Sequence, residues 1–334
     1  MKKKLLSLVL VLALAITLVA GCGSNEKAEV KTGLAVISSI AKSADAGEKD
    51  GLAQVDSVAV AVTVDKDGKI VKCEIDTAQT KINFSKDGKI LSDLKAEIKS
   101  KQELGSEYGM IKGSKIGKEW NEQANAFAKY VIGKTVAEVK GIAVNQEGVT
   151  TDTELASSVT IHITDYVAAI EKAVANAKEL GAKASDKLGL ALITSIANSA
   201  DVGEKDGLAQ AYTNYTATTF DESGKVTSSI IDASQSNVNF TKEGKITTDL
   251  KAPLKTKNEL GEGYGMKKAS KIGKEWFEQA EAFAKFATGK TVDQVKGIAV
   301  NEEGLTTEAE LTSSVTVHVT DFIALVEKAS KTAK

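Results

Sequence analysis

The sequence predicts an α+β fold built as two tandem repeats, each an antiparallel sheet with C-terminal helices packed on one side. Three observations carry this prediction. Segments recur 156 residues apart without insertion, as at Gly33 and Gly189 or Trp120 and Trp276. Within each copy, β-rich runs with glycine-containing turns come first and runs with helical spacing follow. The 334 residues are 42% hydrophobic, which suits two packed domains of ordinary size.

The first 21 residues read as a signal peptide. A basic stretch at 2–4 precedes an apolar stretch at 5–19, and Ala20-Gly21-Cys22 follows. This ending resembles a bacterial lipobox. The resemblance implies cleavage before Cys22, diacylation of its sulfur, and anchoring on the extracytoplasmic face of the cell membrane. Residues 22–32 then form the lipidated cysteine and a polar tether.

The repeat sets the remaining boundaries. The first copy spans residues 33–178, residues 179–188 form a linker, and the second copy spans residues 189–334. Each copy has the size of a normal domain, so we expect each to be able to fold alone.

The first half of each copy predicts strands. Residues 58–64 and 69–75 are rich in β-branched side chains and flank a polar turn at 65–68, which is typical of a hairpin. Residues 82–84 and 89–91 repeat the pattern on a smaller scale. Residues 52–55 predict another strand, and residues 33–40 fit either a strand or a helix.

The second half of each copy predicts helices. Residues 114–132 place apolar side chains at spacings of three and four, and Gly133 is a suitable C-cap. A short helix follows at 135–139. Thr151 to Glu154 has the pattern of a capping box, repeated at 307–310, and a helical face continues from Leu155 to Val174.

Charge and composition exclude several classes of function. The net charge is −2 and every basic residue is Lys, which disfavours nucleic-acid binding. Two His and two Cys are too few for most zinc sites or for a disulfide framework. Asp65 and Asp67 fit a hairpin turn better than a calcium loop, which would end in a glutamate. Cys73, whose counterpart is Ser229, reads as a free thiol.

A continuous last helix would place Ser158, His162 and Asp165 on one face. The order resembles nucleophile, base and orienting acid. A single helix stripe supplies no oxyanion hole, so a half-buried histidine beside a solvated aspartate is the preferred interpretation.

Hydroxyl side chains crowd the predicted start of the last helix, where helix N-termini favour phosphate. In the first copy they include Ser157, Ser158 and Thr160. An aromatic and a methionine, Tyr108 and Met110, precede the long helix in a glycine-rich loop that could cover a flat ligand. The second copy repeats the set at Ser313, Ser314, Thr316, Tyr264 and Met266.

This arrangement resembles the bacterial FMN-binding domain of flavin-carrying membrane and surface proteins. The resemblance rests on Asp50-Gly51, on the hairpin turn Asp67-Gly68-Lys69-Ile70, and on residues 154–160. The family motif there is Asp-x-x-Ser/Thr-Gly-Ala-Thr/Ser, whose last hydroxyl can carry FMN. The corresponding residues are Thr160 and Thr316. Glu, Ser and Val replace the motif's Asp, Gly and Ala, which leaves noncovalent flavin, another planar ligand or loss of the ligand open.

The resemblance implies a lipid-anchored surface protein that binds FMN through these residues and transfers electrons with a redox partner at the cell surface. The protein would supply binding, and the flavin would supply the redox chemistry. The alternative is a non-enzymatic surface module that has lost the flavin and binds a peptide, an envelope polymer or a partner protein. Both interpretations favour an electron carrier or a binding protein over a catalyst, and the sequence alone does not decide the question.

Overall fold

The computed structural model describes residues 28–334, and the predicted signal peptide and Cys22 lie outside them. The described chain is α+β, with two antiparallel sheets of four and three strands. The first sheet has the order β3-β2-β1-β4 and the second β5-β6-β7. The strands are β1 (Glu29–Ser39), β2 (Gly51–Val64), β3 (Ile70–Phe84), β4 (Lys178–Lys183), β5 (Lys187–Ser195), β6 (Gly207–Phe220) and β7 (Val226–Phe240).

Helices follow the strands in both halves of the chain. The N-terminal half, residues 28–177, carries α1 (Lys101–Leu104), α2 (Trp120–Tyr130), α3 (Val136–Lys140), α4 (Thr153–Ala156) and α5 (Thr164–Ala175). The C-terminal half, residues 187–334, carries α6 (Lys257–Leu260), α7 (Trp276–Ala287), α8 (Val292–Lys296), α9 (Ala309–Thr312) and α10 (Thr320–Thr332). Short 3₁₀ turns, η2 (Gly105–Tyr108), η3 (Met110–Lys112) and η4 (Gly261–Tyr264), precede α2 and α7.

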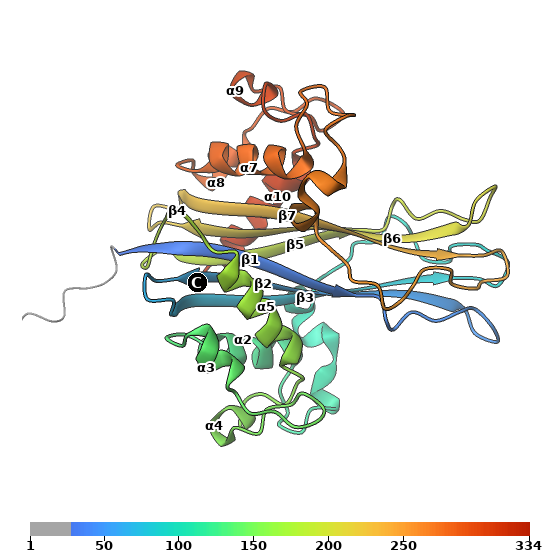
Figure 1. The fold of residues 1–334 in the computed structure, drawn as a ribbon, viewed down its shortest axis with the longest axis horizontal. Coiled ribbons are helices and arrows are strands. Elements are labelled where there is room, and N and C mark those ends of the chain that lie inside the picture. Colours follow the sequence, from blue (N-terminus) through green and yellow to red (C-terminus); the bar gives the residue numbers. More distant parts are fainter. Residues whose placement is uncertain (1–27) are drawn as a thin grey trace, which may run out of the picture.

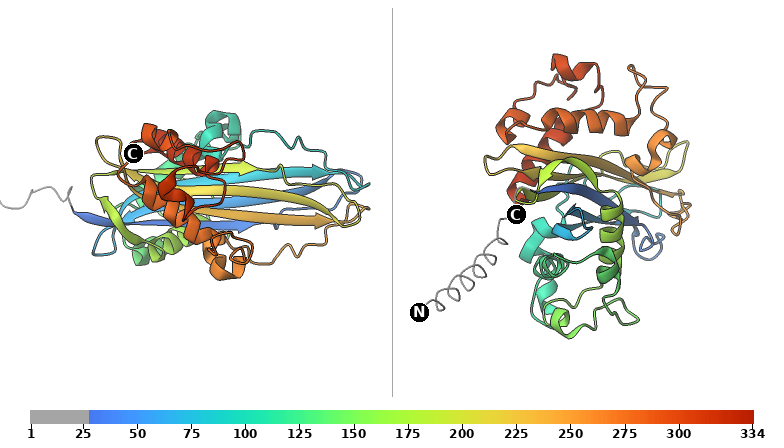
Figure 2. Two further views of the ribbon diagram at one scale, coloured as in Figure 1. Left: turned by 90° about the horizontal axis from the view of Figure 1, so that it is seen from above. Right: turned by 60° about the vertical axis from the view of Figure 1, so that its left-hand side comes forward.

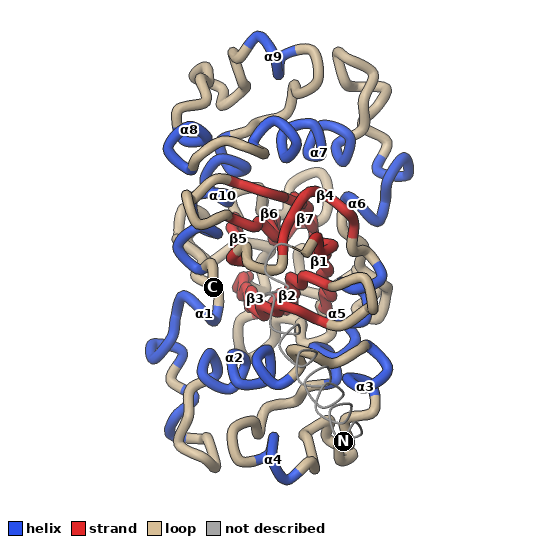
Figure 3. Tube along the Cα trace, turned by 90° about the vertical axis from the view of Figure 1, so that its left-hand side faces the viewer, coloured by secondary structure: helices blue, strands red, loops and turns tan. Residues whose placement is uncertain are grey.

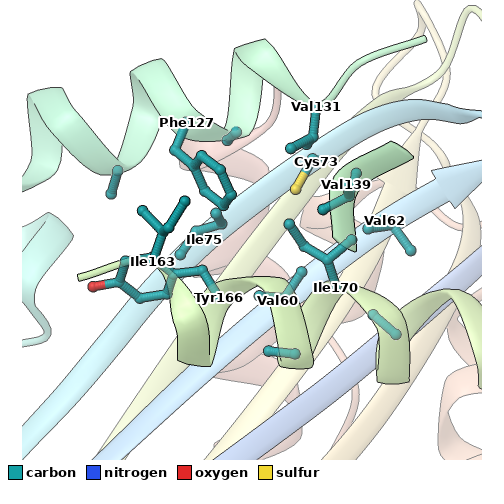
Figure 4. Packing of buried hydrophobic residues seen from close by; sticks show 14 of the residues in the cluster. Val60, Val62, Cys73, Ile75, Phe127, Val131, Val139, Ile163, Tyr166 and Ile170 are labelled. Atoms are coloured by element: carbon teal, nitrogen blue, oxygen red, sulfur yellow. The ribbon is translucent and has the colours of Figure 1, made fainter. Parts of the chain in front are cut away.

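The molecule has four layers, with the two sheets face to face and the helices outside them (Figures 1 and 3). Each sheet packs its outer face against its own helices. In the N-terminal half, Phe127 of α2 and Tyr166 and Ile170 of α5 lie over Val60 and Ile75 (Figure 4). Burying such side chains stabilises a fold by about 1.5–3 kcal/mol each.

The inner faces of the two sheets form a shared core. Leu34 and Val36 of β1 pack with Leu190 and Leu192 of β5, and the ring of Tyr215 is fully buried between the sheets. Because this core takes side chains from both halves, either half alone would expose an apolar sheet face.

The strands run past the helical layers at one end, where the hairpin ends of both halves meet (Figure 2). Phe84 and Phe240 stack there with ring centroids 4.2 Å apart. Two equivalent ion pairs connect the halves, each between an aspartate of one half and a lysine of the other. Asp45 lies 3.2 Å from Lys245, and Asp201 lies 3.1 Å from Lys89.

The strand predictions hold except at residues 89–91, where no strand forms, and the region that allowed either a strand or a helix is β1. Residues 52–55 and 58–64 are parts of one strand, β2, which pairs with β3 along its length. The small second hairpin is reduced to a turn at 85–88 with a single bridge between Phe84 and Ile90. The expected linker contains β4, which pairs with the start of β1.

Two helix predictions are wrong in extent. Residues 114–119 form turns rather than helix, because Gly117 has φ of +64° and the helix is capped at Glu119. The last helix is broken, since residues 157–163 separate α4 from α5. That stretch holds Val159, Thr160, Ile161 and Ile163, whose β-branched side chains disfavour helix.

The capping boxes predicted at 151–154 and 307–310 do not form. Asp152, not Thr151, caps α4 by accepting a hydrogen bond from the Leu155 amide at 2.9 Å. Glu308 takes the same position before α9 without a side-chain cap, and its carboxylate instead accepts from the Ala299 amide. The predicted short helix, by contrast, is α3, and Thr135 caps it in a complete capping box.

Candidate functional site

The loop before α7 is folded back onto the start of the helix by a buried carboxylate. We call residues 265–275, with residues 109–119 in the N-terminal half, the lysine loops. Glu275, the N-cap of α7, is only 2% exposed and accepts from the amides of Met266 and Lys267 at 2.9 and 3.0 Å. Glu119 makes the same pair of bonds to Met110 and Ile111. Neither carboxylate is among the residues that the sequence analysis predicts for the site.

A fully buried glutamine joins each lysine loop to the segment that carries the predicted acceptor threonine. In the C-terminal half, Gln279 Nε2 donates to Ser270 Oγ at 3.3 Å and to the Lys274 carbonyl at 3.1 Å. Its Oε1 accepts from the amide of Thr316 at 2.7 Å and from its hydroxyl at 3.2 Å. All four hydrogen-bonding positions of the amide are therefore used.

Gln123 repeats this arrangement in the N-terminal half. It donates to Ser114 and to the Lys118 carbonyl and accepts from the amide and hydroxyl of Thr160. Sequence reasoning missed both glutamines. The signal was available, because Gln123 falls on the same helical face as Trp120, Ala124 and Phe127, where an apolar residue is the norm.

A cavity of about 270 Å³ lies between the lysine loop and the threonine segment of the C-terminal half. Met266 and Thr316, two of the predicted ligand-binding residues, both line it. The other walls come from residues 269–271, 305–306, 312, 315 and 317. The structure thus brings together residues that are about fifty positions apart in the sequence.

The lysines of these loops lack acidic partners in the described part of the chain. Lys267, Lys268 and Lys271 are exposed, and Lys271 lines the cavity. Neither these nor Lys274 lies within 4 Å of a carboxylate oxygen, and the same holds for Lys112, Lys115 and Lys118 in the other half. The positive charge beside the cavity is therefore available to an anion.

Apart from Met266 and Thr316, none of the predicted residues lines this cavity. Ser157 donates to the Glu154 carbonyl at 2.7 Å, and Ser158 donates to the Leu155 carbonyl at 3.2 Å, so both hydroxyls end the short helix α4. Ser313 and Ser314 follow α9 in the same way along the chain.

Tyr108 and Tyr264 pack against the helix cores, each under a lysine ammonium group. Lys257 is the more enclosed of the two lysines. Its Nζ lies within 5 Å of the ring centres of Tyr212, Tyr264 and Trp276 and donates to the Tyr212 hydroxyl at 2.8 Å. Burial lowers the pKa of Lys257 to about 8.

The structure does not support a hydrolytic triad. His162 is exposed in the break between α4 and α5, and its backbone bridges to Val149. Since the helix is interrupted there, Ser158, His162 and Asp165 share no helical face. No group of three metal-ligating side chains occurs among residues 28–334, and none of the helices described there is long and apolar enough to cross a membrane.

Comparison with known proteins gives no relative: no family model, no curated protein and no solved structure matches this chain.

Proposed function

We propose that the chain is an exported lipoprotein, anchored through Cys22 on the extracytoplasmic face of the cell membrane, with two tandem FMN-binding-like halves. In this proposal the cavity beside the lysine loop of the C-terminal half binds FMN or a similar anionic planar ligand without a covalent bond, and the matching residues of the N-terminal half bind a second one. The protein then carries electrons to or from a redox partner at the cell surface.

One observation supports this proposal above the others. The cavity lined by Met266, Lys271 and Thr316 joins a cluster of unpaired lysines to the segment that resembles the FMN motif. The lysines would neutralise a phosphate, and the buried glutamine would hold the threonine hydroxyl beside it. A volume of about 270 Å³ is below the usual range of about 300–1,000 Å³ for ligand pockets, so the flavin ring would extend over Met266 and Tyr264.

The first test is the absorption spectrum of the mature protein purified from its own host, before and after acid precipitation. We expect flavin absorbance in the native protein and release of the flavin by acid. Replacing Lys267, Lys268 and Lys271 by Gln should weaken FMN uptake by the C-terminal half. The matching change of Lys112 and Lys115 tests the other half. A colourless protein that takes up no added FMN would refute the flavin proposal.

The anchor is tested separately. In the host, the wild-type protein should incorporate labelled palmitate at Cys22, and Cys22→Ser should incorporate none and keep its uncleaved signal peptide. Absence of label in the wild-type protein would contradict the lipoprotein proposal without bearing on flavin.

A second candidate function has its own support. The amides and hydroxyls of Thr160 and Thr316 are bonded inside the protein, which favours a module that keeps the fold and has lost the flavin. Such a module would bind a peptide, an envelope polymer or a partner protein through the lysine loops. Two sites on one chain would then increase the overall affinity by avidity.

A further inference from the structure

A second and larger cavity, of about 750 Å³, lies between β4, β7 and α7. Its volume is in the range of small-molecule sites. Strand β4 follows α5 in the chain, pairs with the start of β1 and also lies against β7 (Figure 1). For this reason β4 forms one border of the cavity. The apolar part of its lining comes from Ile230 and Ile231 of β7 and from Phe277 and Ala284 of α7, and Ser229, Asn258 and Thr288 add neutral polar groups.

The corresponding space in the N-terminal half is polar, and a lysine occupies part of it. There the Lys334 ammonium lies 3.0 Å from Glu74 and 3.3 Å from Asn125, and the remaining cavity is about 350 Å³. The residues 156 positions after Glu74 and Asn121 are Ile230 and Phe277. At both positions the N-terminal half has a polar residue and the C-terminal half an apolar one. Both apolar residues line the larger cavity.

The rim of the larger cavity carries an excess of unpaired positive charge. Lys178 and Lys285 have no carboxylate within 4 Å among the described residues. Of the two acidic residues at the rim, Glu179 is paired with Lys31 at 3.6 Å, which leaves Glu281. Two free ammonium groups and one free carboxylate favour an anionic ligand end.

We propose that this cavity binds an apolar molecule with a single carboxylate, of the class of medium-chain fatty acids. The apolar chain lies on Ile230, Ile231 and Phe277, and the carboxylate faces Lys285. This site is separate from the lysine-loop cavity and does not depend on flavin binding. An acyl chain of a membrane lipid or of the anchor itself shares the apolar part of this chemistry but lacks the free carboxylate.

The test is isothermal titration of the chain from Gly23 to Lys334, which keeps every described residue and needs no detergent. The probes are laurate, methyl laurate and dodecylamine. We expect one laurate per chain, with the ester and the amine at least about tenfold weaker. Equal binding of methyl laurate would overturn the carboxylate assignment and identify an acyl-chain site, and no binding of laurate would overturn the site.

Variants locate the binding. Ile230→Glu with Phe277→Asn gives this half the residues that the other half has at these positions, and should lower laurate affinity at least about tenfold. Lys285→Gln should weaken laurate about threefold or more and leave the methyl ester unchanged. Asn121→Phe makes one of these changes in reverse, in the N-terminal half, and should leave the laurate affinity and stoichiometry unchanged. Loss of laurate binding in Asn121→Phe, with binding kept in the other variants, would place the site in the N-terminal half and overturn the proposal.

Discussion

Replacing Gln279 by Leu should destabilise the protein substantially although the two side chains have similar volumes. The change removes four hydrogen bonds from a side chain with no exposed surface. The Thr316 amide and the Lys274 carbonyl would lose their partner, at a cost of about 1–3 kcal/mol for each buried group left unsatisfied. The Ser270 and Thr316 hydroxyls can rotate toward other acceptors, so we expect a total loss of about 2–5 kcal/mol.

The assay is urea denaturation of residues 23–334 followed by tryptophan fluorescence. Trp276 is the first residue of α7, three positions before Gln279, so the probe lies in the same helix. A lower midpoint with an unchanged slope reports lost stability. Gln123→Leu should behave alike, and Gln146→Leu, in an exposed loop, should change stability by less than about 0.5 kcal/mol. A loss below about 1 kcal/mol in Gln279→Leu would refute the argument that this amide joins the loop to the threonine segment.

Further predictions concern the buried charges and the end of the shared core. Burial raises the pKa of Asp76 and of Asp232 to about 6, so the folded state holds these protons more tightly than the unfolded state, whose Asp pKa is about 3.9. The free energy of unfolding should therefore fall as pH rises from about 4 to 6, by on the order of 3 kcal/mol per carboxyl, and Asp76→Asn should flatten this profile in denaturation measured across that range. A pH profile for Asp76→Asn that matches the wild-type profile would contradict the raised pKa of Asp76. Phe240→Ala should cost about 3–5 kcal/mol by removing the ring stacked on Phe84, whereas a loss below about 1 kcal/mol would show that the hairpin ends are not packed in solution. Gly51→Ala should also destabilise, because its Cβ would lie 2.2 Å from the Phe84 ring, and wild-type stability of this variant would mean that the ring has room to move.

The sequence predicts most of the strands, because their signal is local. Residues 58–64 and 69–75 are rich in β-branched side chains and flank a polar turn, and nearly all of them lie in β2 and β3, which pair with each other. The helical segments were less predictable. Residues 157–163 have helical spacing, but Thr160 bonds to Gln123 across the fold, and this contact competes with the helix. A contact between residues 37 positions apart cannot be recognised from the spacing of apolar residues along the sequence.

The candidate site was predictable only in part for the same reason. Met266 and Thr316 could be named from the motif and the loop, and both line one cavity. The lysines were visible in the sequence, but their lack of acidic partners depends on where the carboxylates fold. Glu275, the nearest acidic residue, is turned inward onto backbone amides, which no spacing rule reveals.

In the inner core between the sheets, equivalent positions of the two halves carry side chains of different size, which is impossible for two identical subunits. Tyr215 occupies the inner face of β6 and its hydroxyl lies 2.7 Å from Ser234, while the positions 156 residues earlier are Ala59 and Ala78. In a symmetric pair of identical chains, any large residue would enter the interface twice, and one close to the axis would meet its own copy. Joining both faces in one polypeptide removes that constraint, so a bulky side chain on one face can be matched by a small one on the other. The same freedom allows one half to keep a large, partly apolar cavity while a lysine occupies part of its smaller, polar counterpart.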